Sequence, residues 1–176
     1  MLEIVTERGL HDAPMSSVLE RSKASAGVVY HHFKSKDAIL AALFSQINQQ
    51  KSEDILAFDS SSMQPREAFL QLGVNLYHYY RSHPREMLFL KQVRVANLAC
   101  CAALEPSTEV AAGLNRYFRP RREGGVFKNW PKSVLDEVTT GLVERLAALK
   151  DEVPEKMLRE IGLHIWDAVL AKSTKE

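Results

Sequence analysis

The residues best placed to do chemistry lie in one short segment near the N-terminus, between Met15 and Lys36. The spacing of its apolar residues predicts two short helices, at about 15–22 and 26–33, joined by a turn at residues 23–25. Ser25 is the expected N-cap of the second helix, because a serine hydroxyl accepts a hydrogen bond from a free backbone N–H. Two short helices joined in this way form a helix-turn-helix, whose second helix can enter the DNA major groove.

The second predicted helix begins with the small residues Ala26, Gly27 and Val28. Small side chains let the backbone approach base edges, and a methyl group can contact the methyl group of thymine. The segment from Arg21 to Lys36 contains no acidic residue. Its basic residues are Arg21, Lys23, Lys34 and Lys36. This composition predicts a local cationic surface of the kind that binds phosphate groups.

The run from Gly27 to Leu40, GVVYHHFKSKDAIL, resembles the signature of the TetR family of bacterial transcriptional regulators. The preceding run from Glu7 to Ala13 is similar to the end of the family's first helix and its glycine turn, and the resemblance covers about residues 4–43. It implies a DNA-binding regulator. The positions at which we then expect DNA contact are Ser16, Ser25, Ala26, Gly27, Val28, Tyr30, His31 and Lys36.

The segment departs from the family pattern at several points. Lys23 stands where the family usually has a glycine in the turn, and Ala26 stands where lysine is common. The chain also begins inside what should be helix one, so we expect this helix to be shortened or the sequence to be incomplete.

The composition of the whole chain says less about function than the segment from Met15 to Lys36 does. The formal net charge of the 176 residues is +1, so binding of nucleic acid must depend on the local cationic surface. No apolar run approaches the roughly 20 residues of a membrane span. Residues Met1 to Glu3 do not resemble the start of a signal peptide. We therefore expect a cytoplasmic protein that has no contact with a membrane.

The apolar periodicity and the prolines predict an all-α protein of about nine helices. Residues 1–47 would form a helix-turn-helix DNA-binding domain of three helices, with a shortened first helix. Gly9 is expected to end the first helix, and Ser35 is expected to cap a long helix from about residue 36 to 58. This long helix would lead into a larger domain, 48–176, for effector binding and dimerisation. The further predicted helices are at about 65–82, 85–104, 106–118, 131–149 and 154–172.

The last two predicted helices are candidates for a subunit interface. The final helix is apolar on two sides, which is typical of a helix buried by two neighbours. In the TetR family the last two helices of each subunit pair into a four-helix bundle, and the resemblance implies the same here. The expected interface residues are Leu142, Leu146, Leu163, Trp166 and Leu170. A homodimer would present two copies of the helix-turn-helix domain, each called a head below, to a palindromic operator.

An aromatic stripe in the larger predicted domain can be interpreted in two ways. Such stripes usually belong to the core, but the resemblance implies a pocket for a small-molecule effector, and tyrosines would give it polar groups. The candidate pocket residues are Phe69, Tyr77, Tyr80, Phe89 and Phe118.

Other features of the sequence point away from catalysis and from metal binding. The chain has no glycine-rich phosphate loop, HExxH or GxSxG motif, so we expect no enzyme activity. Cys100 and Cys101 are too few for a closed zinc site, and apolar packing is their expected role. An arginine-rich loop at residues 119–125 is expected to be solvated, and the alternative is that it binds an acidic effector or DNA. We predict neither a cofactor nor a metal.

The sequence thus predicts a ligand-responsive transcriptional regulator, a repressor that binds a palindromic operator as a homodimer and releases it when a small molecule binds. The alternative is an all-α dimeric module that binds a small molecule and has lost DNA binding. The shortened first helix, the absence of the turn glycine and the near-neutral head favour this alternative. Salt-dependent DNA binding would distinguish the two.

Overall fold

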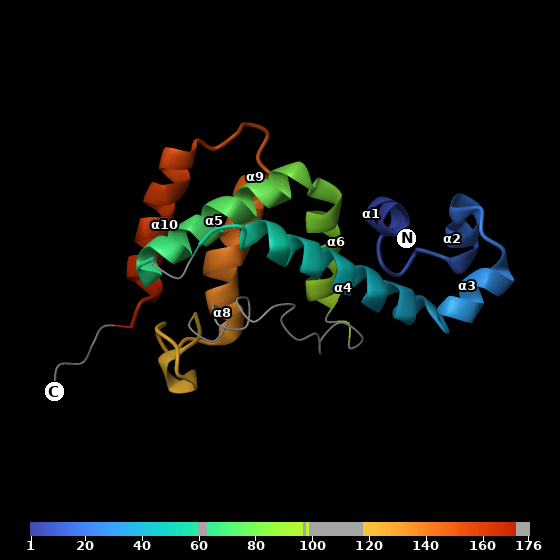
Figure 1. Cartoon of the computed structure of the whole chain (residues 1–176), viewed down its shortest axis with the longest axis horizontal. Helices are drawn as coiled ribbons and strands as arrows, with labels where there is room; N and C mark the ends of the chain where they lie inside the picture. Colours follow the sequence, from blue (N-terminus) through green and yellow to red (C-terminus); the bar gives the residue numbers. More distant parts are fainter. Residues whose placement is uncertain (60–62, 97, 99–117, 172–176) are drawn as a thin grey trace. The chain divides into compact units, whose positions relative to one another are not determined.

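A computed structural model describes residues 1–59, 63–96, 98 and 118–171 (Figure 1). Regular structure in these ranges is helical, apart from two isolated β-bridges, so the predicted all-α fold is confirmed there. Cys100, Cys101 and all but the end of the helix predicted at 106–118 lie outside the described residues. No helix in the described ranges is long and apolar enough to cross a membrane.

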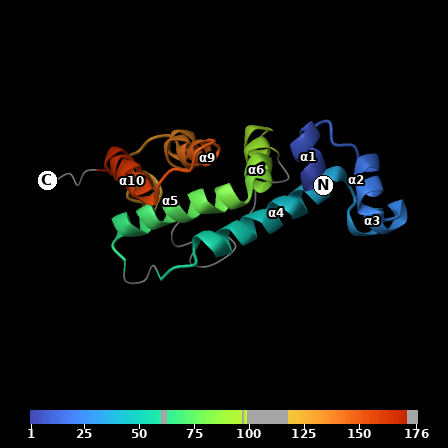
Figure 2. The same ribbon diagram turned by 90° about the horizontal axis from the view of Figure 1, so that it is seen from above.

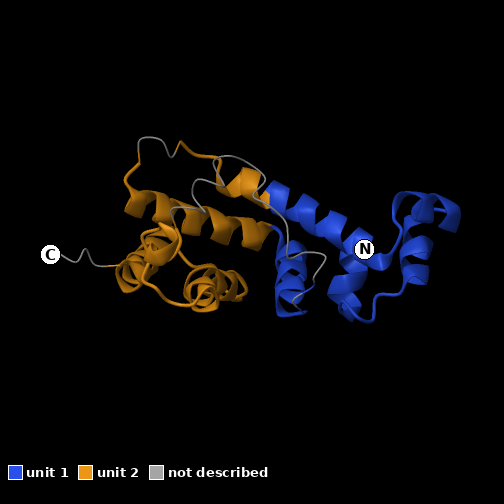
Figure 3. Cartoon of the chain, turned by 90° about the horizontal axis from the view of Figure 1, so that it is seen from below, with its two compact units in different colours: residues 1–50, 83–105 blue, residues 51–82, 106–176 orange. Residues whose placement is uncertain are grey.

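The chain divides into two compact units, coloured separately in Figure 3. The first contains residues 1–50 and 83–105, and the second contains 51–82 and 106–176. Helix α4 passes from the first unit into the second between residues 50 and 51, whereas the sequence analysis places the boundary at residue 47. The chain then returns to the first unit at residue 83. The expected division into 1–47 and 48–176 does not include this return.

The first unit contains the predicted helix-turn-helix. Its helices are α1 (Leu2–Arg8), α2 (Met15–Ser22), α3 (Ala26–His32), the first part of α4 (Lys36–Ile55) and α6 (Pro84–Ala96). Figures 1 and 2 show α1, α2 and α3 around the start of α4, and α6 beside α1. Apolar side chains from all of these helices except α3 are buried: Ile4, Val5, Val18, Ile39, Leu40, Ile47, Phe89, Leu90 and Val93.

The turn between α1 and α2 depends on a glycine. Gly9 has φ 90°, a backbone conformation that side-chain-bearing residues rarely adopt, and its N–H donates to the carbonyl of Val5 at 2.8 Å. Leu10 and Ala13, on the far side of this turn, are buried. The prediction that Gly9 ends the first helix is therefore confirmed, and the turn anchors the chain in the core before α2 begins.

The second unit is built on α5 (Pro65–Ser82), which lies beside α10 (Glu155–Val169) and α9 (Leu142–Ala147) in Figure 2. Tyr77 of α5 is fully buried, and its hydroxyl accepts a hydrogen bond from the backbone N–H of Val153 at 2.8 Å. Arg159 of α10 donates to Glu67 and Gln71 of α5, at 2.7 and 2.6 Å. These contacts hold the first turns of α10 and the loop before it against α5.

The penultimate helix differs from the regular one predicted at 131–149. It consists of α8 (Lys132–Asp136), a π-helical segment η3 (Glu137–Gly141) and α9. Thr139 in this segment donates from its hydroxyl to the carbonyl of Leu135 at 2.7 Å. Hydroxyls that bond back to the preceding turn compete with regular helix geometry, which is consistent with a π segment here.

An aromatic cluster fills the core of the second unit and includes Trp166 of α10. Trp166 is only 6% exposed within the single chain, and its ring lies 5.3 Å from that of Phe69 and 6.2 Å from that of Phe127. Phe118 stacks on Phe127 at 5.7 Å. The expected position of Trp166 at a subunit interface therefore needs correction, because its own chain already covers the indole.

The arginine-rich loop is tightly folded. Its backbone closes through hydrogen bonds from Arg121 N–H to the Phe127 carbonyl at 2.8 Å, and from Phe127 N–H to the Arg119 carbonyl at 2.9 Å. A Cβ at Gly125 would lie 2.1 Å from the Arg119 carbonyl oxygen, so the loop requires glycine there. Arg119, Arg121 and Arg122 are exposed, as expected of a solvated loop.

Candidate nucleic-acid interface

Helix α3 begins as the sequence predicts. The hydroxyl of Ser25 accepts a hydrogen bond from the N–H of Val28 at 3.3 Å, which confirms Ser25 as the N-cap. Ala26, Gly27 and Val28 are all exposed, and the Val28 side chain retains 55% of its accessible surface. An exposed valine between small residues contributes little to the core, so this end of α3 is free to meet a partner.

The turn before α3 holds its chain in a strained conformation. Lys23 has φ 55° and ψ 18°, and it is the only non-glycine residue of the described ranges with a positive φ. A left-handed conformation costs roughly 1–2 kcal/mol for a residue that has a side chain. The family pattern in the sequence analysis has glycine here, and glycine adopts a positive φ without this cost.

Tyr30 and His31 lie on the exposed part of α3. Tyr30 is 46% exposed, and the His31 ring packs edge-on against that of His32, with 5.1 Å between their centroids. The neighbouring Val29 and Phe33 are half-buried. The hydroxyl of Tyr30 and the imidazole of His31 can therefore reach a ligand outside the head.

Lys36 has a structural role that the sequence did not reveal. Its ammonium donates to the carbonyl oxygens of Leu10 at 2.6 Å and His11 at 3.2 Å, and so closes the turn between α1 and α2. Ser35 caps α4 as predicted, accepting from the N–H of Ala38 at 3.1 Å. Contact between Lys36 and a phosphate stays a prediction, and it would require the ammonium to share or leave these carbonyls.

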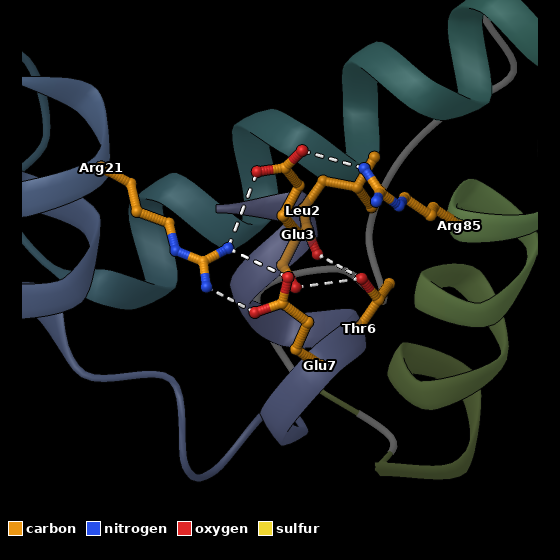
Figure 4. A network of polar contacts seen from close by, with 6 residues as sticks. All are labelled: Leu2, Glu3, Thr6, Glu7, Arg21 and Arg85. Carbon is orange, nitrogen blue, oxygen red and sulfur yellow. Dashed lines mark hydrogen bonds and ion pairs between the residues drawn. The ribbon is translucent and has the colours of Figure 1, made fainter.

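Arg21 also differs from its expected role in the cationic surface. Its guanidinium donates to both carboxylate oxygens of Glu7, at 3.1 and 2.5 Å, and lies 3.7 Å from Glu3 (Figure 4). The hydrogen bond from Arg21 lowers the pKa of the Glu7 carboxyl. Two carboxylates thus offset the charge of Arg21, which therefore adds less positive charge to the surface than the sequence predicts. Lys23 and Lys34 are exposed.

Sequence reasoning missed the partners of Arg21. Glu3 and Glu7 are four residues apart and share one face of α1, a spacing that is visible in the sequence. The sequence does not show that this face of α1 meets α2 and α6. Arg21 lies 14 residues from Glu7, and Arg85 lies 82 residues from Glu3. Ser16 is exposed on α2, where contact with a DNA backbone stays a prediction.

The expected effector residues do not all belong to one unit. Phe69, Tyr77, Tyr80 and Phe118 lie in the second unit, whereas Phe89 lies on α6 in the first. Tyr77, Tyr80 and Phe89 are at most 2% exposed, and Phe69 and Phe118 belong to the aromatic cluster. The rings are therefore packed, and their role in a pocket stays a prediction.

The remaining expected interface residues keep some accessible surface. Leu142, Leu146, Leu163 and Leu170 are all partly buried within the single chain. Exposed apolar side chains lie on or next to the same helices: Val134 at 42%, Leu149 at 49% and Met157 at 50%. Contact of these helices with a second subunit stays a prediction.

Comparisons with known proteins agree with this helix-turn-helix. Residues 2–43 match the family described as "Bacterial regulatory proteins, tetR family". Over 55 residues the chain is 33% identical to the HTH-type transcriptional regulator BetI of Escherichia coli and of Klebsiella pneumoniae. That match covers 31% of this chain and spans only 28% of the length of those relatives.

Solved structures share the fold over nearly the whole chain. A TetR family transcription regulator from Marinobacter aquaeolei superposes with a TM-score of 0.75 at 17% identity, covering 97% of this chain and 92% of that one. A putative TetR family regulator from Vibrio parahaemolyticus gives 0.71 at 19% identity, covering 97% and 95%. Residues 2–43 thus carry the helix-turn-helix of the TetR family of bacterial regulatory proteins, and the chain as a whole has the fold of these solved structures.

Proposed function

We propose that this protein is a transcriptional repressor that binds a palindromic operator as a homodimer and releases it when a small molecule binds. The observation that carries the proposal is the exposed start of α3, where Ser25 caps a helix that presents Ala26, Gly27 and Val28 to the outside. The helix belongs to the segment that matches the family. The protein would act in the cytoplasm, where the DNA is, without a membrane partner.

The chemistry of α3 indicates how it would read DNA. Gly27 has no side chain, so the helix can approach the bases closely, while Ala26 and Val28 present methyl groups to the methyl group of thymine. Tyr30 and His31 would donate hydrogen bonds to phosphate oxygens and so fix the register of the helix in the groove. Ser16 and Ser25 would add contacts to the same backbone.

Dimerisation would supply the second half-site. The partly buried leucines of α9, α10 and the residue after α10 would contribute the interface, together with the exposed apolar side chains of Val134, Leu149 and Met157. A homodimer with twofold symmetry places two recognition helices on a palindrome about one helical turn of DNA apart.

Release by an effector requires two conformers that bind the effector with different affinity. Helix α4 suits this role because it begins in the first unit and ends in the second. An effector held in the second unit would favour a conformer in which α4 moves and the spacing of the two heads no longer matches the operator.

The experiment that tests the proposal is binding of the full chain to the promoter DNA upstream of its own gene, at two salt concentrations. We expect sequence-preferring binding that weakens with salt. Tyr30→Ala should lower the affinity without loss of the dimer, and Lys91→Ala, a change at an exposed position of α6, is the control. Absence of binding to this promoter and to a pool of random sites would favour the alternative, a ligand-binding module.

A further inference from the structure

A network of charged side chains connects three helices of the first unit (Figure 4). Glu3 and Glu7 project from α1, Arg21 comes from α2 and Arg85 comes from α6. Arg85 donates to one oxygen of Glu3 at 2.9 Å, and Arg21 lies 3.7 Å from the other oxygen. The carboxylate of Glu3 therefore has one arginine from α6 on one side and one from the helix-turn-helix on the other.

The two arginines share Glu3 unequally. Arg21 has a second, closer partner in Glu7, to which it donates two hydrogen bonds, whereas Glu3 is the acceptor that the structure gives Arg85. If Arg85 moves away with α6, Glu3 loses the hydrogen bond that holds its carboxylate beside Arg21, and the contact between α1 and α2 weakens. The position of α6 therefore affects the forces on α2, although Arg85 does not itself contact Arg21.

The exposure of the network suits it to coupling rather than to stability. The four side chains are between 41% and 60% exposed. Ion pairs in this range contribute little to stability, and salt screens them. Small changes in the position of a helix can therefore make or break them at low energetic cost.

Arg85 lies close in sequence to the point at which the chain passes from the second unit to the first. Arg85 lies in the first turn of α6, and only His83 separates α6 from α5. Helix α5 belongs to the second unit and carries the buried Tyr77 and Tyr80. The residue that holds Glu3 thus lies in the turn of α6 that directly follows the joint to α5.

We infer that Glu3 is a positioning residue that couples α6 to the helix-turn-helix, so that the state of α6 affects the mobility of α2 and the affinity for DNA. The coupling within the first unit stands on the contacts alone. Its consequence for DNA rests on the proposed function. Sharing of one carboxylate by arginines of two different helices is the observation that carries the inference.

The test is amide hydrogen exchange of the full chain without DNA, measured by mass spectrometry for the peptides that cover α2. Arg85→Gln should increase exchange in Met15–Ser22 by about two- to fivefold, the range that an exposed ion pair can supply. Arg85→Lys should stay close to the wild type. Lys91→Gln removes a charge from an exposed position of the same helix and should change nothing in α2.

A second arm repeats the exchange measurement at raised salt concentration. Raising the salt concentration should increase exchange in α2 in the wild type, and should do so much less in Arg85→Gln and Glu3→Gln. If Arg85→Gln fails to fold, which uniformly fast exchange in α10 of the second unit would reveal, Glu3→Gln decides the question.

The inference is overturned if Arg85→Gln leaves α2 unchanged, or if Lys91→Gln has the same effect. Where the wild type binds DNA, Arg85→Gln should also lower the affinity by about two- to fivefold, because a looser head is less often in the binding-competent state. If the wild type binds no DNA, the proposed function fails, and the exchange measurements still decide the coupling.

Discussion

The salt dependence of DNA binding follows from the positions of the four basic residues near α3. Arg21 is paired with Glu7 and Glu3, and the ammonium of Lys36 is bonded to two backbone carbonyls. Lys23 and Lys34 are exposed. We therefore expect two phosphate-binding cations in each head, and about four in the proposed dimer.

Each neutralised phosphate contributes about −0.9 to the slope of the logarithm of the binding constant against the logarithm of salt concentration. Four contacts give a slope of about −3.6, which is about a 150-fold loss of affinity between 50 and 200 mM salt. If Arg21 and Lys36 also bound phosphates, eight contacts would give about −7.2, a loss of about 20,000-fold.

The assay is a fluorescence-anisotropy titration of operator DNA at five salt concentrations and pH 8, where free imidazole is uncharged. Lys34→Gln should make the slope less steep by about 1.8, one contact in each head. Arg21→Gln should leave the slope unchanged, and Lys91→Gln is the control on α6. A wild-type slope near −7, or a shallower slope in Arg21→Gln, would refute the assignment of the cations.

Three further predictions concern stability. Lys23→Gly should increase the free energy of unfolding by about 0.5–1 kcal/mol in a urea titration, because glycine relieves the left-handed strain but adds freedom to the unfolded chain; an unchanged or lower stability would contradict this. Since the pKa of Glu7 is lowered in the folded state, its contribution to stability is complete at neutral pH and is lost as the pH falls through the folded pKa, below the ordinary 4.5. Melting temperatures of the wild type and Glu7→Gln should therefore differ at pH 7 and converge in acid. Trp166→Ala should cost about 3–5 kcal/mol at any protein concentration, whereas a cost that grows on dilution would place the indole at a subunit interface.

The sequence predicts best those features that depend on neighbouring residues. The caps at Ser25 and Ser35 and the end of α1 at Gly9 are set by local backbone chemistry, and all three are confirmed. The helix-turn-helix follows from the same local signals together with the order of the residues in the family motif. The exposed start of α3 is consistent with its small side chains.

Features that depend on distant parts of the chain could not be predicted in this way. Lys36 and Arg21 look like free cations in the sequence because their partners lie on other elements. Trp166 lies on an apolar face that could equally meet a second subunit, and only the folded chain shows that Phe69 and Phe127 already cover it. The return of α6 to the first unit has no local signal at all.

That return affects the order in which the protein can fold as it is synthesised. The first unit is discontinuous, so the head lacks α6, with its buried Phe89 and Val93, until residue 96 has been translated. At roughly 5–20 residues per second, the ribosome adds the residues between the end of the first segment and the end of α6 in about 2–9 s. During this interval the apolar side of α1 that α6 later covers is open to chaperones, and a fragment that ends after α4 would leave it uncovered permanently.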